Sequence, residues 1–166
     1  NTGGNKTIKL KNKCLLVSLS ELKHSPIDIE IRDQYLKYAS ENRKDQNLIE
    51  ENKDYKKLKE SEEFILFTTT KGYGKISSAY SYRISKGKIG SGTTGIKLSN
   101  ETGNVVDAFI VNDGDSIIVV SDKGQVIRLN VNDIRITGRT TKGVKIFRLP
   151  EGDNIVSVSR IRIINE

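Results

Sequence analysis

The chain has 166 residues, of which 35% are hydrophobic, and a formal net charge of +7. It contains no run of 18 or more apolar residues, which excludes a membrane-spanning helix, and no amino-terminal pattern of a signal peptide. The single cysteine, Cys14, excludes an internal disulfide, and its apolar neighbours predict a buried side chain in a reducing cytoplasm.

The first segment, residues 1–20, is expected to be the end of a structural unit. Thr7-Ile-Lys-Leu10 and Leu15-Leu-Val-Ser-Leu19 match only the closing half of a pattern that returns twice later in the chain. The sequence contains no methionine. We therefore expect it to be a piece of a longer polypeptide.

Residues 21–62 are expected to be a charged insertion. The closing motif recurs after 48 residues between Ile96 and Val144, yet Ile8 and Ile96 are 88 residues apart. The segment from Glu21 to Glu63 holds 9 basic and 12 acidic residues and few large apolar ones. Such a composition predicts too little buried surface to offset the entropy of ordering.

Apolar side chains in this insertion nevertheless predict one or two short helices. Two groups have helical spacing, the first regularly and the second less so: Ile27, Ile31, Tyr35 and Tyr38, then Leu48, Tyr55 and Leu58. We expect this stripe to pack on the rest of the chain. Stacking of its aromatic rings on nucleic-acid bases is the alternative.

The rest of the chain contains one pattern twice, predicting blades at residues 63–113 and 114–164. The first copy leads from Phe64-Ile-Leu-Phe through Gly95-Ile-Lys-Leu98 to Val105-Val-Asp-Ala-Phe109. The second leads from Ile117-Ile-Val-Val through Gly143-Val-Lys-Ile146 to Ile155-Val-Ser-Val-Ser159. A period of about 50 residues is typical of arrays whose units bury their apolar faces against one another.

Four β-branched segments bounded by turn residues predict four short strands in each copy. The predicted strands are 64–70, 75–80, 95–98 and 105–111, then 116–121, 125–131, 143–147 and 155–161. The predicted fold class is all-β. It consists of about two and a half propeller-like blades of four antiparallel strands, with a charged, partly helical or disordered insertion.

The basic residues of the repeats are predicted to lie on an outer surface. Outside the insertion the chain holds 19 basic and 9 acidic residues. Strand alternation turns Ile96, Leu98, Val144 and Ile146 inward and the cations between them outward. A repeated row of cations suits a polyanion. The candidate contacts are Lys75, Arg83, Lys86, Lys88, Lys97, Arg128, Arg135, Arg139, Lys142 and Lys145.

No catalytic or metal site is expected in this chain. The carboxylates of Asp113-Gly-Asp115 and Glu151-Gly-Asp153 stand in hairpin turns, where acidic residues favour the turn itself. Residues 87–92 have the glycines of a phosphate loop but lack its Gly-Lys-Ser/Thr ending and a following helix. His24 has no cluster of Cys, His or carboxylate residues around it.

Four motifs occur in a recognisable order between Phe64 and Ile161. They are Lys71-Gly-Tyr-Gly-Lys75, Gly95-Ile-Lys-Leu98, Gly138-Arg-Thr-Thr-Lys-Gly-Val144 and Glu151-Gly-Asp-Asn-Ile-Val156. In this order they resemble the carboxy-terminal domain of the DNA gyrase A subunit, part of a type IIA topoisomerase. The family's Gln-Arg-Arg-Gly-Gly-Lys-Gly box is absent, and residues 85–90 and 138–143 are only degenerate counterparts.

The resemblance implies a β-pinwheel whose basic rim wraps double-stranded DNA through sequence-independent phosphate contacts. In the family, this wrapping contributes to ATP-dependent negative supercoiling by the whole enzyme. The implied partners are DNA, the remainder of gyrase A and the gyrase B subunit, in an assembly of two of each in the cytoplasm, at the nucleoid. The resemblance implies no cofactor and no strand cleavage in this chain, because ATP and magnesium act elsewhere in the holoenzyme.

Two alternatives stay open. The first is the related accessory domain from the A subunit of topoisomerase IV, although residues 71–75 fit gyrase better. The handedness of DNA wrapping separates these two. The second is a propeller-type module that binds another protein rather than DNA.

Overall fold

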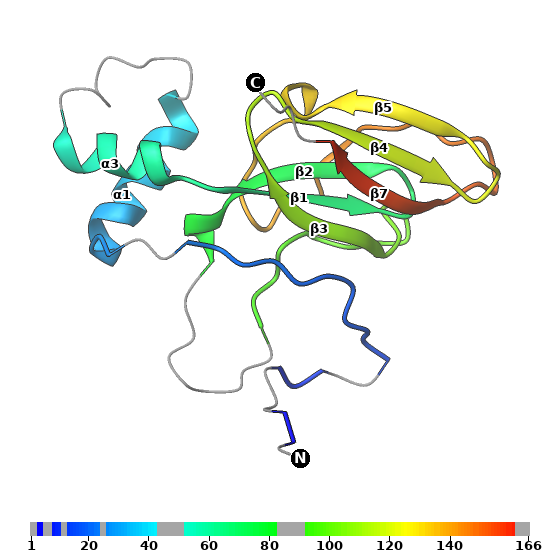
Figure 1. The fold of residues 1–166 in the computed structure, drawn as a ribbon, viewed down its shortest axis with the longest axis horizontal. Coiled ribbons are helices and arrows are strands. Elements are labelled where there is room, and N and C mark those ends of the chain that lie inside the picture. The colour runs from blue at the N-terminus through cyan, green and yellow to red at the C-terminus, as the bar shows by residue number, and fades with distance from the viewer. Residues whose placement is uncertain are drawn as a thin grey trace.

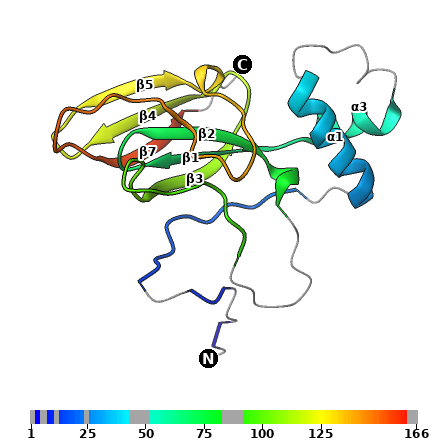
Figure 2. The same ribbon diagram turned by 180° about the vertical axis from the view of Figure 1, so that it is seen from behind.

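The computed structural model describes residues 3–4, 8–10, 13–23, 26–42, 52–82 and 92–161. The strands form two antiparallel sheets, and two helices lie beyond one end of them (Figures 1 and 2). The elements are α1 (Ile29–Asn42), α3 (Lys53–Ser61), β1 (Phe64–Thr69), β2 (Tyr73–Ser78), η1 (Ala79–Ser81), β3 (Val105–Val111), β4 (Ser116–Ser121), β5 (Val126–Asn130), η2 (Val131–Asp133), β6 (Val144–Lys145) and β7 (Ile155–Ile161). The predicted fold class is confirmed. Neither described helix is long and apolar enough to cross a membrane.

The two sheets repeat one pairing scheme. β1 pairs with β2 and β3, and β4 pairs with β5 and β7, all antiparallel. The register shifts between Thr68 and Thr69 in the first sheet and between Val120 and Ser121 in the second. Each central strand therefore has an irregularity at the same place. The repeated sequence pattern is also a repeated hydrogen-bond pattern.

Matched hydrogen bonds hold the turn at one end of each sheet. Thr70 N donates to Asn104 O at 2.8 Å, and Asp122 N donates to Asn154 O at 2.9 Å. In return, Asn104 N donates to Thr70 Oγ1 and Asn154 N donates to Asp122 Oδ1, both at 3.2 Å. The equivalent turn amide thus donates to a threonine hydroxyl in the first repeat and to an aspartate carboxylate in the second.

The short strand β6 comes from the second repeat in sequence but belongs to the first sheet. It pairs with β2, Tyr73 opposite Lys145 and Gly74 opposite Val144. Phe147 N, just beyond β6, donates to Gly72 O at 3.2 Å. A Cβ on Gly72, whose φ is 81°, would lie 2.3 Å from Phe147 O, so this crossing requires glycine. The crossing ties the repeats together; the predicted boundaries at residues 63–113 and 114–164 stay a prediction.

One apolar core lies between the two sheets. Leu66 and Ile76 of the first sheet are buried in it with Ile117, Val119 and Val158 of the second. Because side chains alternate along a strand, one face of each sheet supplies these residues. Strand β3 also contacts β7.

Residues 13–23 follow the edge of β3 without forming a strand (Figure 1). Ser18 Oγ donates to Ala108 O at 2.7 Å and accepts from Ala108 N at 3.3 Å. Leu15 and Leu19 are 84% and 91% exposed. The prediction of a buried Cys14 is wrong, since its side chain is exposed like those of its apolar neighbours. The apolar run meets the sheet edge through a serine rather than packing into the core.

The two helices form a second, smaller core with the repeats. Tyr35 and Leu58 are buried against Tyr80 of η1, whose hydroxyl donates to Leu58 O at 3.0 Å. The rings of Tyr35 and Tyr55 meet edge to face, with centroids 5.7 Å apart. The predicted packing of the aromatic stripe on the repeats is confirmed. Tyr35, Ala39 and Leu58 are the buried residues of this segment in that core, and the expectation that the segment of residues 21–62 buries too little surface to offset its ordering stays a prediction, because residues 24–25 and 43–51 lie outside the described residues.

Two residues considered in the insertion, His24 and Leu48, lie outside the described residues. The start of α3 follows a common sequence rule. Asn52 caps the helix by accepting from Asp54 N at 3.0 Å and Tyr55 N at 3.2 Å. Such a cap satisfies amides that lack partners within the first turn.

Candidate nucleic-acid interface

Two chain segments bring four of the predicted cations together. Lys97 N donates to Thr141 O at 3.0 Å, and Arg139 Nη1 donates to Thr94 O at 3.3 Å. Lys142 and Lys145 follow on the second of these segments. We call Lys97, Arg139, Lys142 and Lys145 the cation cluster. Arg139 is half-buried and the other three are exposed.

Part of the reasoning that led to these cations is wrong. Residues 95–98 form no strand, and Leu98 is 46% exposed rather than turned inward. Val144 is 37% exposed as well. Ile96 is buried and Ile146 half-buried, as expected. Only two residues of β6 pair with β2, and a short ladder of this kind does not impose strict alternation.

Lys75 lies beneath the loop of residues 138–143 rather than on the surface. Its side chain is fully buried, and Nζ donates to Gly138 O at 2.9 Å and to Arg139 O at 2.6 Å. Burial, and then the nearby charge of Arg139, lower the pKa of Lys75 to about 8. The prediction that Lys75 lies on an outer surface is therefore wrong, and its contact with DNA stays a prediction. Lys75 supports the loop that carries Arg139 and Lys142.

Glu101 joins the cation cluster from the turn before β3. Lys142 Nζ lies 2.9 Å from Glu101 Oε2, and the Tyr73 hydroxyl donates to Glu101 Oε1. The ammonium groups of Lys142 and Lys145 each lie 5.7 Å from the centroid of the Tyr73 ring. The hydrogen bonds from Lys142 and then Tyr73 lower the pKa of Glu101. The same contacts with Glu101 raise the pKa of Lys142 and of Tyr73.

Sequence reasoning missed both Tyr73 and Glu101. Tyr73 stands in the Lys71–Lys75 motif, which could have directed attention to it. Glu101 is 41 residues from Lys142, and nothing in the sequence pattern links them. Their contact follows from the crossing of β6 onto β2, which only the fold shows.

The remaining predicted cations are not joined to the cation cluster in the part of the chain that the structure describes. Arg128 is exposed on β5, and its Nη2 donates to Ser116 Oγ at 3.1 Å. Arg135 is exposed and lines a hollow beside Leu36 of α1. Arg83, Lys86 and Lys88 lie outside the described residues. Contacts of these five residues with DNA stay a prediction.

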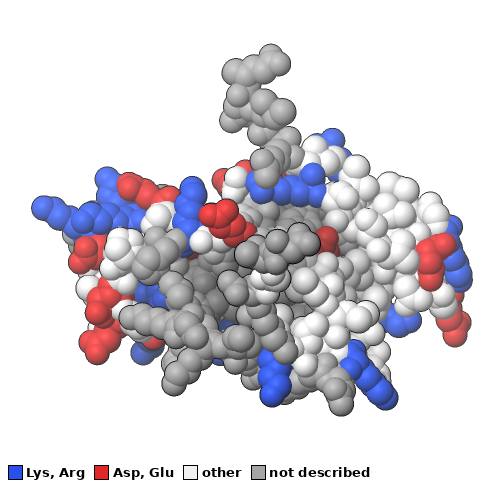
Figure 3. Space-filling model, turned by 60° about the horizontal axis from the view of Figure 1, so that its bottom comes forward, with Lys and Arg blue, Asp and Glu red and all other residues white. Residues whose placement is uncertain are grey.

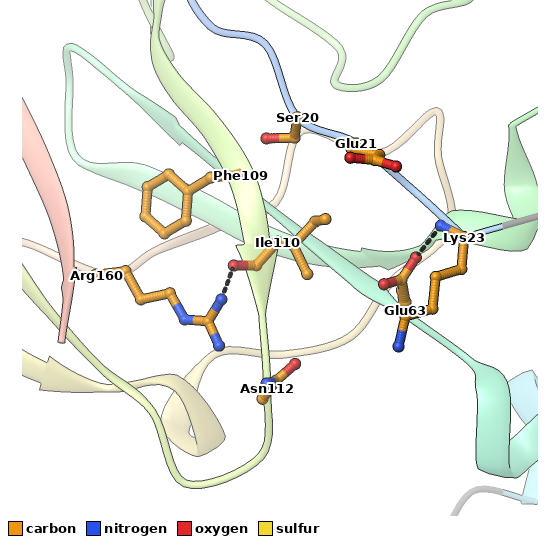
Figure 4. A pocket seen from close by; sticks show the side chains of 8 residues that line it. All are labelled: Ser20, Glu21, Lys23, Glu63, Phe109, Ile110, Asn112 and Arg160. Carbon is orange, nitrogen blue, oxygen red and sulfur yellow. Dashed lines mark hydrogen bonds between the residues drawn. The ribbon is translucent and has the colours of Figure 1, made fainter. Parts of the chain in front are cut away.

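A separate hollow of about 780 Å³ lies between β3 and the segment of residues 20–23 (Figure 4). At one side, Arg160 Nη1 donates to Ile110 O at 3.0 Å, and its Nε lies 2.6 Å from Asp115 Oδ2. At the other, Glu63 Oε2 accepts from Lys23 N at 2.6 Å. These charged groups are bound within the protein. Nor does any group of three His, Cys, Asp or Glu side chains suit a metal ion within the described ranges.

Charge is unevenly distributed over the surface shown in Figure 3. Acidic and basic side chains are mixed over the helical end, while much of the sheet side beside it is uncharged. Among its described residues this face presents no continuous basic surface.

The fold is that of a repeat protein of the propeller type. Its two sheets have the same pairing scheme and a shared core, and strand β6 of the second repeat pairs with the first sheet. The family described as "DNA gyrase C-terminal domain, beta-propeller" matches residues 63–112 and 115–162. The chain belongs to this family.

Relatives of known sequence agree. The chain is 36% identical over 180 residues to the DNA gyrase A subunit of Granulibacter bethesdensis, with 95% of this chain and 19% of the relative covered. It is 45% identical over 101 residues to the DNA gyrase A subunit of Rickettsia bellii, with 61% of this chain and 11% of the relative covered. The chain thus spans less than a fifth of the length of these relatives.

Two solved structures are similar to this fold. One is a DNA gyrase A C-terminal domain, with 31% identity and a TM-score of 0.54, covering 60% of this chain and 33% of that one. The other is a C-terminal domain of DNA topoisomerase IV, with 29% identity and a TM-score of 0.55, covering 61% and 30%. Fold similarity alone does not separate the two kinds of relative.

Proposed function

We propose that this chain binds double-stranded DNA through its phosphates, at the cation cluster. The observation that carries the proposal is the gathering of Lys97, Arg139, Lys142 and Lys145 by hydrogen bonds between two distant segments. The loop between Gly138 and Gly143 also contains two threonines, whose hydroxyls and amides can approach a phosphate.

The contacts we propose position DNA without reading its sequence. Lysine ammonium and arginine guanidinium groups neutralise phosphates, and sequence is read instead by groups that reach base edges in a groove. The cations here stand on a loop and on a two-residue strand that pairs with β2, so they offer a surface rather than an inserted element. Phosphate binding is the chemistry that this arrangement supports.

Membership of the family extends the proposal to the whole enzyme. We propose that DNA held here is bent around the repeats, and that this wrapping contributes to ATP-dependent negative supercoiling by an assembly of gyrase A and B subunits in the cytoplasm. The chain supplies binding, while ATP hydrolysis and strand cleavage take place in other domains. Its relatives carry the name of that enzyme's A chain.

The experiment compares two double variants that remove the same charge. Lys97→Gln with Lys145→Gln removes two cations of the cluster, and Lys56→Gln with Lys57→Gln removes two exposed cations of α3. Binding of a mixed-sequence duplex is measured across a salt series. Each lost phosphate contact should lower the log–log salt slope by about 0.9. We expect this loss in the cluster variant and a smaller change in the α3 variant.

Three results would contradict the proposal. A wild-type affinity that does not change with salt would show that phosphate neutralisation does not drive binding. Equal losses in the two double variants would show that net charge, not the cation cluster, matters. Loss for one DNA sequence alone would contradict sequence-independent contacts.

A second candidate is the corresponding domain of topoisomerase IV, favoured by the similar fold and TM-score of that solved structure. Relaxed circular DNA distinguishes the two. Wrapping with a positive hand changes the topology of circles closed in the presence of the protein, and this result would support the gyrase role. Binding without such a change would support the alternative.

A further inference from the structure

The carboxylate of Glu101 lies where donors converge from three parts of the fold. Tyr73 comes from β2, Lys145 lies directly opposite it in β6, and Lys142 precedes β6 in the loop. Glu101 itself stands in the turn before β3. That turn is fixed to the end of the β1–β2 hairpin, because Lys71 N donates to Thr102 O at 3.3 Å. The backbone thus determines the positions of all four residues.

The two donors that bind this carboxylate, the Lys142 ammonium and the Tyr73 hydroxyl, also suit a phosphodiester. Both anions present two oxygens that share a negative charge, and both accept short hydrogen bonds from ammonium and hydroxyl groups. The Tyr73 side chain is only 8% exposed and places its hydroxyl at Glu101 Oε1. The ammonium of Lys142 holds the second oxygen at 2.9 Å, and Lys145 stands over the same tyrosine ring.

The contact between Glu101 and Lys142 is open to exchange. Their side chains are 55% and 52% exposed, so solvent and other ions reach both groups. Exposed ion pairs are weak, because water and salt screen them. A DNA phosphate that arrives with the other cations of the cluster can therefore replace the carboxylate.

We propose that Tyr73, Lys142 and Lys145 form a binding site for a DNA phosphate, which Glu101 occupies in the absence of DNA. Glu101 then limits the affinity for DNA, since the phosphate that binds at this site must displace the carboxylate. This inference rests on the proposed function, because the phosphate belongs to the DNA that the cation cluster binds.

The second repeat offers a matched control. Glu151 occupies the place of Glu101, in the turn before β7, and Gln125 occupies the place of Tyr73. Within the described part of the chain the Glu151 carboxylate contacts no cation; Lys123 Nζ donates instead to the backbone Glu151 O at 2.8 Å. Replacing either glutamate by glutamine removes one negative charge from an exposed turn, but only at Glu101 does this remove a charge that competes with a phosphate for Lys142.

The experiment measures binding of a mixed-sequence duplex to the full chain in a salt series. Glu101→Gln should bind several-fold more tightly than wild type across the series, since no carboxylate has to be displaced, and its affinity should still fall with salt because phosphates are neutralised. Glu151→Gln should leave the affinity close to that of wild type. Equal behaviour of the two variants, or weaker binding by Glu101→Gln, would overturn the inference.

A double-mutant cycle keeps the test decisive if one variant is poorly folded. Lys142→Gln should cost more affinity in the Glu101→Gln background than in wild type, because in wild type Glu101 competes with the phosphate for the Lys142 ammonium. Tyr73→Phe, which keeps the ring, should likewise reduce the gain from Glu101→Gln. Additive effects would overturn the inference. If wild type itself fails to bind DNA, the proposed function fails; if it binds and the cycle is additive, the phosphate site alone fails.

Discussion

The two sheets share one backbone pattern but differ in what their equivalent faces contact. In the first sheet Leu66 lies opposite Ile76, and both are buried between the sheets. In the second sheet Ile118 lies opposite Arg128 at the same place. Arg128 is exposed and Ile118 only half-buried. Pairing is therefore repeated, while burial depends on what stands against each face.

On the other face of each sheet, the apolar residues belong to the second sheet and the charged residue to the first. In the second sheet Val119 and Val158 are buried in the core, with Ile127 packed against them. In the first sheet the place of Ile127 is taken by Lys75, opposite Phe67, and its ammonium binds the loop of residues 138–143. The same backbone position thus carries an apolar residue that packs between the sheets, Ile127, or a lysine that supports a loop, Lys75. Strand preference alone does not decide between them, because the outcome depends on what packs against the position.

The largest expected effect on stability comes from exchanging Ile76 of the first sheet and Arg128, its equivalent in the second. Ile76→Arg places a guanidinium without a partner in the core, and we expect the free energy of unfolding to fall by more than about 3 kcal/mol. Arg128→Ile alters an exposed position and should change it by less than about 1 kcal/mol. Urea unfolding followed by circular dichroism measures both. Losses of equal size would show that the two faces have the same surroundings.

Lys75→Ile copies the second repeat into the first, with an intermediate expected effect. It leaves the carbonyls of Gly138 and Arg139 without their donor, which should cost about 1–3 kcal/mol and loosen the loop. DNA affinity should fall as well, because Arg139 and Lys142 stand on that loop. Lys123→Ile, in an exposed turn, is the control.

The pH dependence of stability identifies this lysine specifically. The pKa of Lys75 is about 8 in the folded chain against an ordinary 10.5, so between these values the unfolded chain holds more protons. Stability contributed by this group therefore rises with pH across that window and is constant above it. The difference between wild type and Lys75→Ile should grow in favour of wild type from pH 8 to 10.5. A flat difference would mean that Lys75 is not desolvated.

Sequence patterns predicted the strands where local signals are complete. The bounds of residues 105–111, 116–121 and 155–161 agree with the structure. Turns that contain glycine and aspartate or asparagine bound the first two runs at both ends and precede the third. Residues 95–98 have the composition of a strand but form none, since a strand needs a partner along its length. The repeat itself contained one unused signal: Ile127 stands at the place of Lys75, which indicates an inward position.

The candidate site was less predictable than the fold. Lys97, Arg139, Lys142 and Lys145 could be named from charge alone. The contact between Lys142 and Glu101 could not be predicted, because it depends on strand β6, which pairs with the sheet of the other repeat. Likewise, no composition rule shows that the tyrosines of α1 and α3 find Tyr80, which lies in the repeats. Contacts between segments distant in sequence are the part that periodicity does not contain.

The smallest expected effect concerns the outer edge of the first sheet. Ser18 Oγ makes the contact of residues 13–23 with Ala108, and the equivalent of Ala108 in the second sheet is the buried Val158. Ser18→Ala should cost about 1 kcal/mol, the usual net value of one hydrogen bond, and release this segment from β3. Trypsin should then cleave faster after Lys13 and Lys23. Ser157→Ala, at an exposed site of β7, should leave cleavage unchanged. Unaltered cleavage in Ser18→Ala would show that the serine does not hold this segment in place. Apolar contacts, like those of the buried Val158 in the second sheet, would then hold it.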